Sequence, residues 1–155
     1  MPSVLYAPLA KTIITQRFGV NPAWYRAYGC KGHNGIDFRT KFLDTPLGRR
    51  YCRPMASGVV IGVGNQGKTG YGIFVRVQHD DGAQSAYGHF YKYFVKVGQR
   101  VERKSLLGGT ILGLTDNTGR STGSHFHGAY RPPNWKKIYN NGFLGYINFL
   151  PMLKI

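Results

Sequence analysis

The strongest constraint on the fold of this chain is the stretch from residue 58 to residue 90, which reads as successive strands joined by turns. A Val/Ile-rich run occupies 58–63, and the segment IFVRVQ at 73–78 alternates apolar and polar residues. Glycines or an Asp-Asp-Gly sequence follow these runs. Alternation with a period of two is typical of a strand with one buried face, and short glycine-rich connections favour antiparallel neighbours. We therefore expect an antiparallel sheet built around these residues.

The rest of the chain has the same character, with short apolar runs separated by glycine and proline. Glycine accounts for 22 of 155 residues, about twice the usual share of roughly 7%. No segment shows a convincing helical pattern of ten or so residues. Residues 21–32 and 39–54 are predicted to be loops, and the apolar end of 140–153 is predicted to dock on the sheet. The predicted fold class is all-β and antiparallel, in a single domain over residues 1–155.

The charge balance is strongly basic. The chain has 21 Lys and Arg against 6 Asp and Glu, a net charge of +15. This excess is larger than solubility requires in a small domain, so it predicts an anionic partner. Nucleic acid is one candidate class, and the anionic polymers or phospholipids of a bacterial envelope are another.

Targeting segments and cysteines add little to the functional assignment. No basic stretch followed by an apolar run marks a secretory signal, and no apolar run is long enough to span a membrane. Cys30 and Cys52 are too few for a disulfide scaffold, and they form either one bridge or two free thiols. Cys30 also stands in a Cys-x-x-His spacing with His33, but the second such pair that a structural zinc site needs is absent.

The segment STGSHFHGAYR at 121–131 contains two of the five histidines of the chain. Because side chains alternate along a strand, His125 and His127 are expected to point to one face and Phe126 to the other. Two imidazoles on one face are able to share a metal ion or a catalytic water. The motif alone does not distinguish such a site from the exposed polar face of an ordinary strand.

A second pair of polar residues occurs in the segment HNGIDF at 33–38. On an extended segment His33, Gly35 and Asp37 share a face, and glycine leaves the space between the other two open. Ile36 and Phe38 then face the core. Imidazole and carboxylate groups are both good zinc ligands, and catalytic zinc sites use three protein ligands. An aspartate that caps a turn is the simpler alternative.

Three segments in this order, HNGIDF, YGHF and TGRSTGSHFH, resemble peptidase family M23, the zinc metallopeptidases of the lysostaphin/LytM type. The resemblance also includes ITQRFG near the start and VKVGQRVERKSLLG in the middle, so it covers nearly the whole chain. It implies a single-domain antiparallel β-sheet groove with a metal at its floor. One departure is that Gly128 and Ala129 follow the second histidine, where the family often has an aromatic residue and then Glu or Gln.

The resemblance also implies roles for individual residues. His33, Asp37 and His127 match the three zinc ligands, with one zinc ion per chain. His89 and His125 match the two histidines that assist hydrolysis, and the sequence does not say which of them is the general base.

Other groove residues are less well determined by the sequence. His79 precedes the Asp-Asp-Gly turn, where we expect it to face solvent without a role. Substrate-binding residues are not identified, although the loops at 21–32, 39–54 and 116–124 are expected to select the bond that is cleaved.

The function implied by the resemblance is hydrolysis of peptide bonds in bacterial peptidoglycan, with lysis of cell walls. Without a secretory signal or a separate wall-binding module, the chain resembles a phage or prophage lysin that acts in the envelope after release by lysis. The positive charge would then attract anionic envelope polymers or lipids. We expect a monomer and no specific nucleic-acid partner. The alternatives are a catalytically inactive peptidoglycan- or partner-binding domain of the same fold and a nucleic-acid-binding module.

Overall fold

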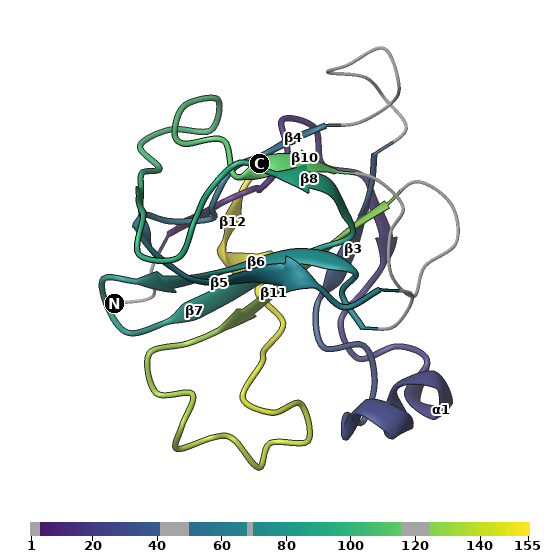
Figure 1. Cartoon of the computed structure of the whole chain (residues 1–155). Coiled ribbons are helices and arrows are strands. Elements are labelled where there is room, and N and C mark those ends of the chain that lie inside the picture. The colour runs from purple at the N-terminus through teal and green to yellow at the C-terminus, as the bar shows by residue number, and fades with distance from the viewer. Residues whose placement is uncertain (1–3, 41–49, 68–69, 116–124) are drawn as a thin grey trace.

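The computed structural model describes residues 4–40, 50–67, 70–115 and 125–155. Within these ranges nearly all of the regular secondary structure is β-strand, as the sequence predicts (Figure 1). No helix in the described part has the length and apolar character needed to cross a membrane.

The main sheet has seven strands in the order β2-β3-β11-β7-β6-β5-β9, and every neighbouring pair is antiparallel. The pattern at 58–90 lies in this sheet and continues into β8 of a second one, which confirms the antiparallel prediction. The strands of the main sheet are β2 (Ile14–Gln16), β3 (Ile36–Arg39), β5 (Gly58–Asn65), β6 (Ile73–His79), β7 (Gln84–Gly88), β9 (Arg100–Val101) and β11 (His125–Arg131).

Two smaller sheets accompany the main one. A three-stranded antiparallel sheet, β4-β10-β8, lies across from the main sheet in Figure 1, and β1 pairs with β12 in parallel. The apolar tail docks on the main sheet as predicted, because the Ile147 N–H donates to the carbonyl oxygen of Tyr130 at 3.0 Å, but the parallel β1–β12 pair departs from the antiparallel prediction. The strands are β1 (Leu5–Tyr6), β4 (Tyr51–Cys52), β8 (Phe90–Tyr93), β10 (Gly113–Thr115) and β12 (Leu153–Lys154).

Two segments predicted to be loops contain regular structure. The 21–32 segment includes the helix α1 (Pro22–Tyr25) and the 3₁₀ helix η1 (Arg26–Tyr28), and proline begins α1, a position where its missing N–H is not needed. The 39–54 segment contains β4, although residues 41–49 lie outside the described part of the chain. A further 3₁₀ helix, η2 (Leu150–Met152), precedes β12.

The core lies between the main sheet and the three-stranded sheet. It combines aromatic residues of the main sheet, such as Phe38 and Phe126, with Cys52, Phe90 and other residues from the opposite side, all fully buried. As predicted, Phe126 faces this core while its neighbours in β11 point to the other face of the sheet. The alternation in β3 and β11 therefore assigns one face to stability and leaves the other for a site.

The prediction that His79 faces solvent is wrong. His79 is 5% exposed, and its ring nitrogens contact the Ser57 carbonyl oxygen at 3.1 Å and the Ser85 hydroxyl at 2.9 Å. The Ser85 hydroxyl in turn donates a hydrogen bond to the buried Tyr87 hydroxyl at 2.6 Å. Two turn aspartates follow His79, but β6 still carries its side chain inward, and the buried ring is satisfied by this polar chain.

Candidate metal centre and active site

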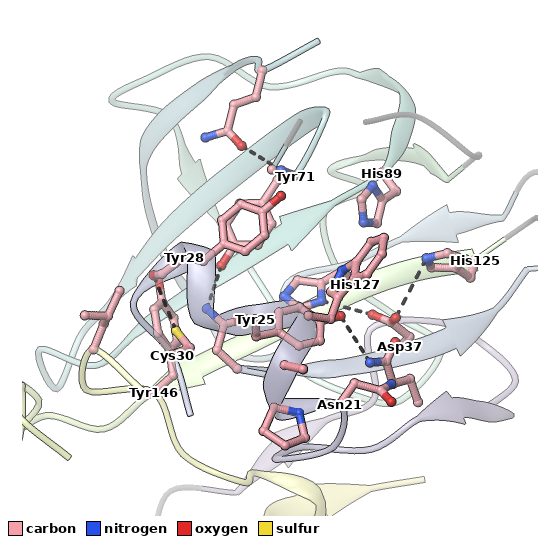
Figure 2. A pocket seen from close by; sticks show the side chains of 18 of the residues that line it. Asn21, Tyr25, Tyr28, Cys30, Asp37, Tyr71, His89, His125, His127 and Tyr146 are labelled. Atoms are coloured by element: carbon pink, nitrogen blue, oxygen red, sulfur yellow. Dashed lines mark hydrogen bonds and ion pairs between the residues drawn. The ribbon is translucent and has the colours of Figure 1, made fainter. Parts of the chain in front are cut away.

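Strand register brings the predicted ligands together. In the antiparallel pair β3–β11, His127 lies directly opposite Asp37, so residues far apart in sequence become cross-strand neighbours. His33 precedes β3 on the same side. Figure 2 shows Asp37, His125 and His127 grouped in the pocket, with His89 nearby.

Three ligand atoms converge at one point. His33 Nε2, Asp37 Oδ1 and His127 Nδ1 lie 3.0 Å, 3.1 Å and 2.9 Å from one another, taken pairwise. All three residues are buried, at 0%, 5% and 5% exposure. Two imidazole nitrogens and a carboxylate oxygen are a donor set typical of zinc. Among the described residues, these three side chains form a group that is able to hold a metal ion.

The hydrogen bonds around His33 favour a metal ligand over a purely structural histidine. Its Nδ1 lies 3.1 Å from the carbonyl oxygen of Arg17, which has no proton to give, so Nδ1–H must donate. In the neutral tautomer that this bond selects, Nε2 carries no proton, so Nε2 and the Asp37 carboxylate would be two acceptors 3.1 Å apart. A cation between them removes this conflict, and a carbonyl behind the ring is the usual partner of a metal-bound histidine.

A buried nitrogen of His127 also favours a metal ligand over a purely structural histidine. Its Nε2 is buried without a hydrogen-bond partner, while Nδ1 points at the cluster. Buried polar atoms without partners are rare and costly in a site with only a structural role. The donor set and these two histidines fit a zinc ion.

Two glycines make room at the site, Gly35 for the His127 ring and Gly88 for Tyr71, which stacks on that ring. A Cβ at Gly35 would lie 2.2 Å from the carbonyl oxygen of Gly128 and 2.8 Å from Cε1 of His127. The sequence prediction that glycine keeps this space open is confirmed. Gly88 pairs with His127 across β7 and β11, and a Cβ there would lie 3.0 Å from Cβ of Tyr71.

Burial and the neighbouring charges shift the pKa values of Asp37 and His127. Burial raises the pKa of the Asp37 carboxyl, but the hydrogen bonds and charges of His127 and His33 outweigh it and hold that pKa well below its usual range. Burial lowers the pKa of His127 despite the neighbouring carboxylate. The anionic aspartate and neutral imidazole are the forms that bind a metal.

His125 and His89 lie beside the cluster without joining it. His125 Nε2 is 3.7 Å from Asp37 Oδ2, too far for a hydrogen bond, and the His125 side chain is 17% exposed. The ring centroids of His89 and His125 are 5.2 Å apart. His89 stands between β7 and β8 with φ of 65°, in the left-handed region, and its N–H donates to the carbonyl oxygen of Tyr71 at 2.7 Å. Residues other than glycine that adopt this left-handed backbone conformation are often found at functional sites.

Two tyrosines beside the ligands were not predicted. The Tyr71 ring stacks on the His127 ring with centroids 5.0 Å apart, and the Tyr25 ring lies 5.0 Å from that of His33. Both line an open groove of about 1250 Å³ together with the histidine cluster, and Tyr28 lines it too (Figure 2). Tyr25 belongs to the unpredicted helix α1, and Tyr71 follows a glycine-rich turn, so neither had a periodic pattern to reveal it.

The cysteines do not contribute ligands. Cys30 and Cys52 are both free and buried, which decides between the two states left open by the sequence. Burial raises the pKa of both thiols, so they remain protonated, whereas metal binding needs the thiolate.

Comparison with known sequences identifies relatives of the whole central region. The profile of peptidase family M23 matches residues 31–139. The DD-carboxypeptidase/endopeptidase Mpg of Neisseria meningitidis serogroup B is 32% identical over 124 residues, which cover 77% of this chain and 24% of that protein. The peptidoglycan DD-endopeptidase ShyA of Vibrio cholerae is 37% identical over 95 residues, which cover 61% of this chain and 19% of that protein. The chain thus spans about a quarter or less of the length of these relatives.

Solved structures show the same fold. A zinc-containing peptidase from Vibrio cholerae is 28% identical with a TM-score of 0.62, over 86% of this chain and 38% of that chain. The catalytic domain of the antimicrobial peptidase lysostaphin from Staphylococcus simulans is 23% identical with a TM-score of 0.65, over 90% of each chain. At that identity the second likeness shows the fold alone, and it confirms the predicted β-architecture.

Proposed function

This chain belongs to peptidase family M23, and on that premise we propose that it is a zinc-dependent endopeptidase that hydrolyses peptide bonds in bacterial peptidoglycan. The observation that carries the proposal is the convergence of His33, Asp37 and His127 at the floor of an open groove, with His89 and His125 beside them. A relative named as a peptidoglycan DD-endopeptidase supports the substrate class, and a relative named as a DD-carboxypeptidase/endopeptidase supports the activity.

We propose that His33 Nε2, Asp37 Oδ1 and His127 Nδ1 hold one zinc ion. When bound, zinc supplies Lewis-acid polarisation of a scissile carbonyl and makes water more acidic at neutral pH. Asp37 is held anionic by its two histidine neighbours, and the Arg17 carbonyl keeps the proton of His33 on the far side of the ring. Tyr71 covers one face of the His127 ring and restrains its orientation.

His125 and His89 are the proposed proton carriers. The His125 side chain is partly exposed to the groove, and its Nε2 lies 3.7 Å from Asp37 Oδ2, a separation that does not commit the nitrogen to a hydrogen bond. The left-handed backbone of His89 directs a second imidazole toward the same space. One ring takes a proton from water and the other steadies negative charge on the substrate oxygen, tasks that suit an imidazole near neutral pH.

The bacterial cell envelope is the proposed place of action. A net charge of +15 would draw the protein to anionic wall polymers or lipid phosphates. Release by lysis, as in a phage-type lysin, is the proposed route to that substrate.

The test is turbidity loss of purified cell walls together with the zinc content of the protein. We expect about one zinc per chain, wall lysis that stops when a strong chelator removes it, and recovery when zinc is added back. Lysis that persists with no metal bound would contradict the zinc proposal.

The same assay separates the alternatives. A catalytically inactive binding domain would sediment with walls and hold zinc without lowering turbidity. A nucleic-acid-binding module would need no metal and would bind oligonucleotides in preference to walls.

A further inference from the structure

The groove contains a cation that the proposed hydrolysis does not use. Arg76 lies on β6, is half-buried, and lines the same groove as Asp37 and the histidines. Its guanidinium carbon lies 5.7 Å from the centre of the Tyr71 ring, and that ring stacks on His127 at 5.0 Å. A single aromatic side chain therefore contacts both the cation and a proposed zinc ligand.

Arg76 has few protein partners for its donors. Among the described residues, its one hydrogen bond runs from Nη1 to the Tyr146 hydroxyl at 3.0 Å. A guanidinium has five N–H donors in a planar fork that matches a carboxylate. Arg76 lines the groove, and the Tyr146 hydroxyl carries no charge to balance the cation.

The acidic residues in the described part of the chain, including Asp37 in the same groove, have other partners than Arg76. They are engaged as follows: Asp37 with the histidine cluster, Asp80 and Glu102 with an arginine of β9, and Asp81 with the backbone of the β6–β7 turn. A partly desolvated cation without a carboxylate partner is costly to maintain unless an anion from outside completes it. The groove is therefore suited to receive a negative group at Arg76, which one aromatic ring, that of Tyr71, separates from the proposed ligand His127.

We propose that Arg76 binds a free carboxylate of the substrate, on the residue that leaves with the amine. This inference rests on the proposed function and specifies its substrate class. A diamino acid that carries a carboxyl group on the carbon of its acylated amine, as diaminopimelate does, has a carboxylate next to the scissile nitrogen, and so does a terminal D-alanine. A glycyl cross-bridge has none at that position, so Arg76 selects against it.

The experiment compares two synthetic peptides that differ at one group. Both have a D-alanyl amide bond to a diamino acid, and the carboxylate beside that bond is free in one and a carboxamide in the other. Rates of cleavage by the zinc-loaded protein are measured as kcat/KM, and binding is measured by calorimetry. The variants are Arg76→Gln, Arg76→Lys and the control Lys96→Gln, which removes an equal charge from an exposed site outside the groove.

We expect the unmodified protein to prefer the free acid by about 10- to 100-fold, the factor for a charge-assisted hydrogen bond. Arg76→Gln should reduce cleavage of the acid to the level of the carboxamide, Arg76→Lys should keep part of the preference, and Lys96→Gln should keep all of it. Zinc content and thermal melting of each variant report whether it is folded.

Three results overturn the inference: equal cleavage of both peptides by the unmodified protein, preference for the carboxamide, or equal losses on both peptides in a folded Arg76→Gln. If Arg76→Gln does not fold, the preference of the unmodified protein and of Arg76→Lys still decides. Cleavage without discrimination leaves the proposed function standing. Binding that depends on Arg76 and on the carboxylate, with no cleavage of either peptide, supports the carboxylate site and rejects the peptidase proposal.

Discussion

Substituting Gly35 by alanine should weaken zinc binding without changing any ligand. The added Cβ would lie 2.2 Å from the Gly128 carbonyl oxygen and 2.8–2.9 Å from two ring atoms of His127, whereas ordinary contact begins near 3.4 Å. Strands β3 and β11 must therefore separate by about 1 Å, or the His127 ring must move. Metal sites tolerate only about 0.2 Å of error in ligand distances, so we expect zinc affinity to fall at least 10- to 100-fold. Overpacking should also lower the free energy of unfolding by about 1–3 kcal/mol.

The assay is competition for zinc against a chelator of known affinity, with urea unfolding of the same samples. Gly62→Ala is the matched control, because a Cβ there meets its nearest neighbour at 3.8 Å and its backbone is not left-handed. We expect that variant to keep its zinc and to be as stable as the unmodified protein or slightly more so. A folded Gly35→Ala that holds zinc as tightly as the control would refute the steric argument and the ligand geometry on which it depends.

Four further results are expected. His127→Ala should lose zinc and activity together, whereas His125→Ala should keep zinc while wall hydrolysis drops by about 10²–10⁴-fold; the reverse pattern in metal analysis would exchange their roles. The Cys30→Ser, Cys52→Ser double variant should keep zinc and activity but melt at a lower temperature, because a hydroxyl replaces a thiol in the core. Burial lowers the pKa of His79 in the folded state, so stability present above about pH 6.5 should be lost as the pH falls, and His79→Gln should show a smaller loss between pH 7.5 and pH 5 in urea midpoints. Binding to purified walls should weaken steeply as salt rises from about 0.01 M to 0.15 M and the screening length drops from ~30 Å to ~8 Å; salt-independent binding would indicate specific recognition instead.

The fold class and the two candidate pairs, His33 with Asp37 and His125 with His127, were accessible from the sequence because both depend on local rules. The choice of three ligands among these residues came from the family resemblance. The alternation in β6 is a two-residue pattern, and it requires no knowledge of distant residues. The same rule placed Phe126 in the core and its flanking histidines on the opposite face. The segment HNGIDF likewise shows a histidine, a glycine and an aspartate on one face. The expectation of a single domain over 1–155 stays a prediction, as do the individual roles of the histidines.

The tertiary structure decided everything that depends on residues far apart in the chain. Register between β3 and β11 set His127 opposite Asp37, and no local pattern contains that pairing. His79 was misjudged because the turn after it is polar, whereas its burial depends on Ser85 in the next strand.

Arg76 shows most clearly where sequence reasoning ended. In the sequence it is the polar member of an alternating strand, which indicates a solvated residue. In the folded chain the groove-facing side of the main sheet is partly enclosed by Tyr71 and Tyr146, so the same position becomes a half-buried cation in the groove that also contains the proposed zinc ligands. The two-residue period of a strand assigns a side chain to a face, but the surroundings of that face are made by other parts of the chain, and only their packing determines its chemistry.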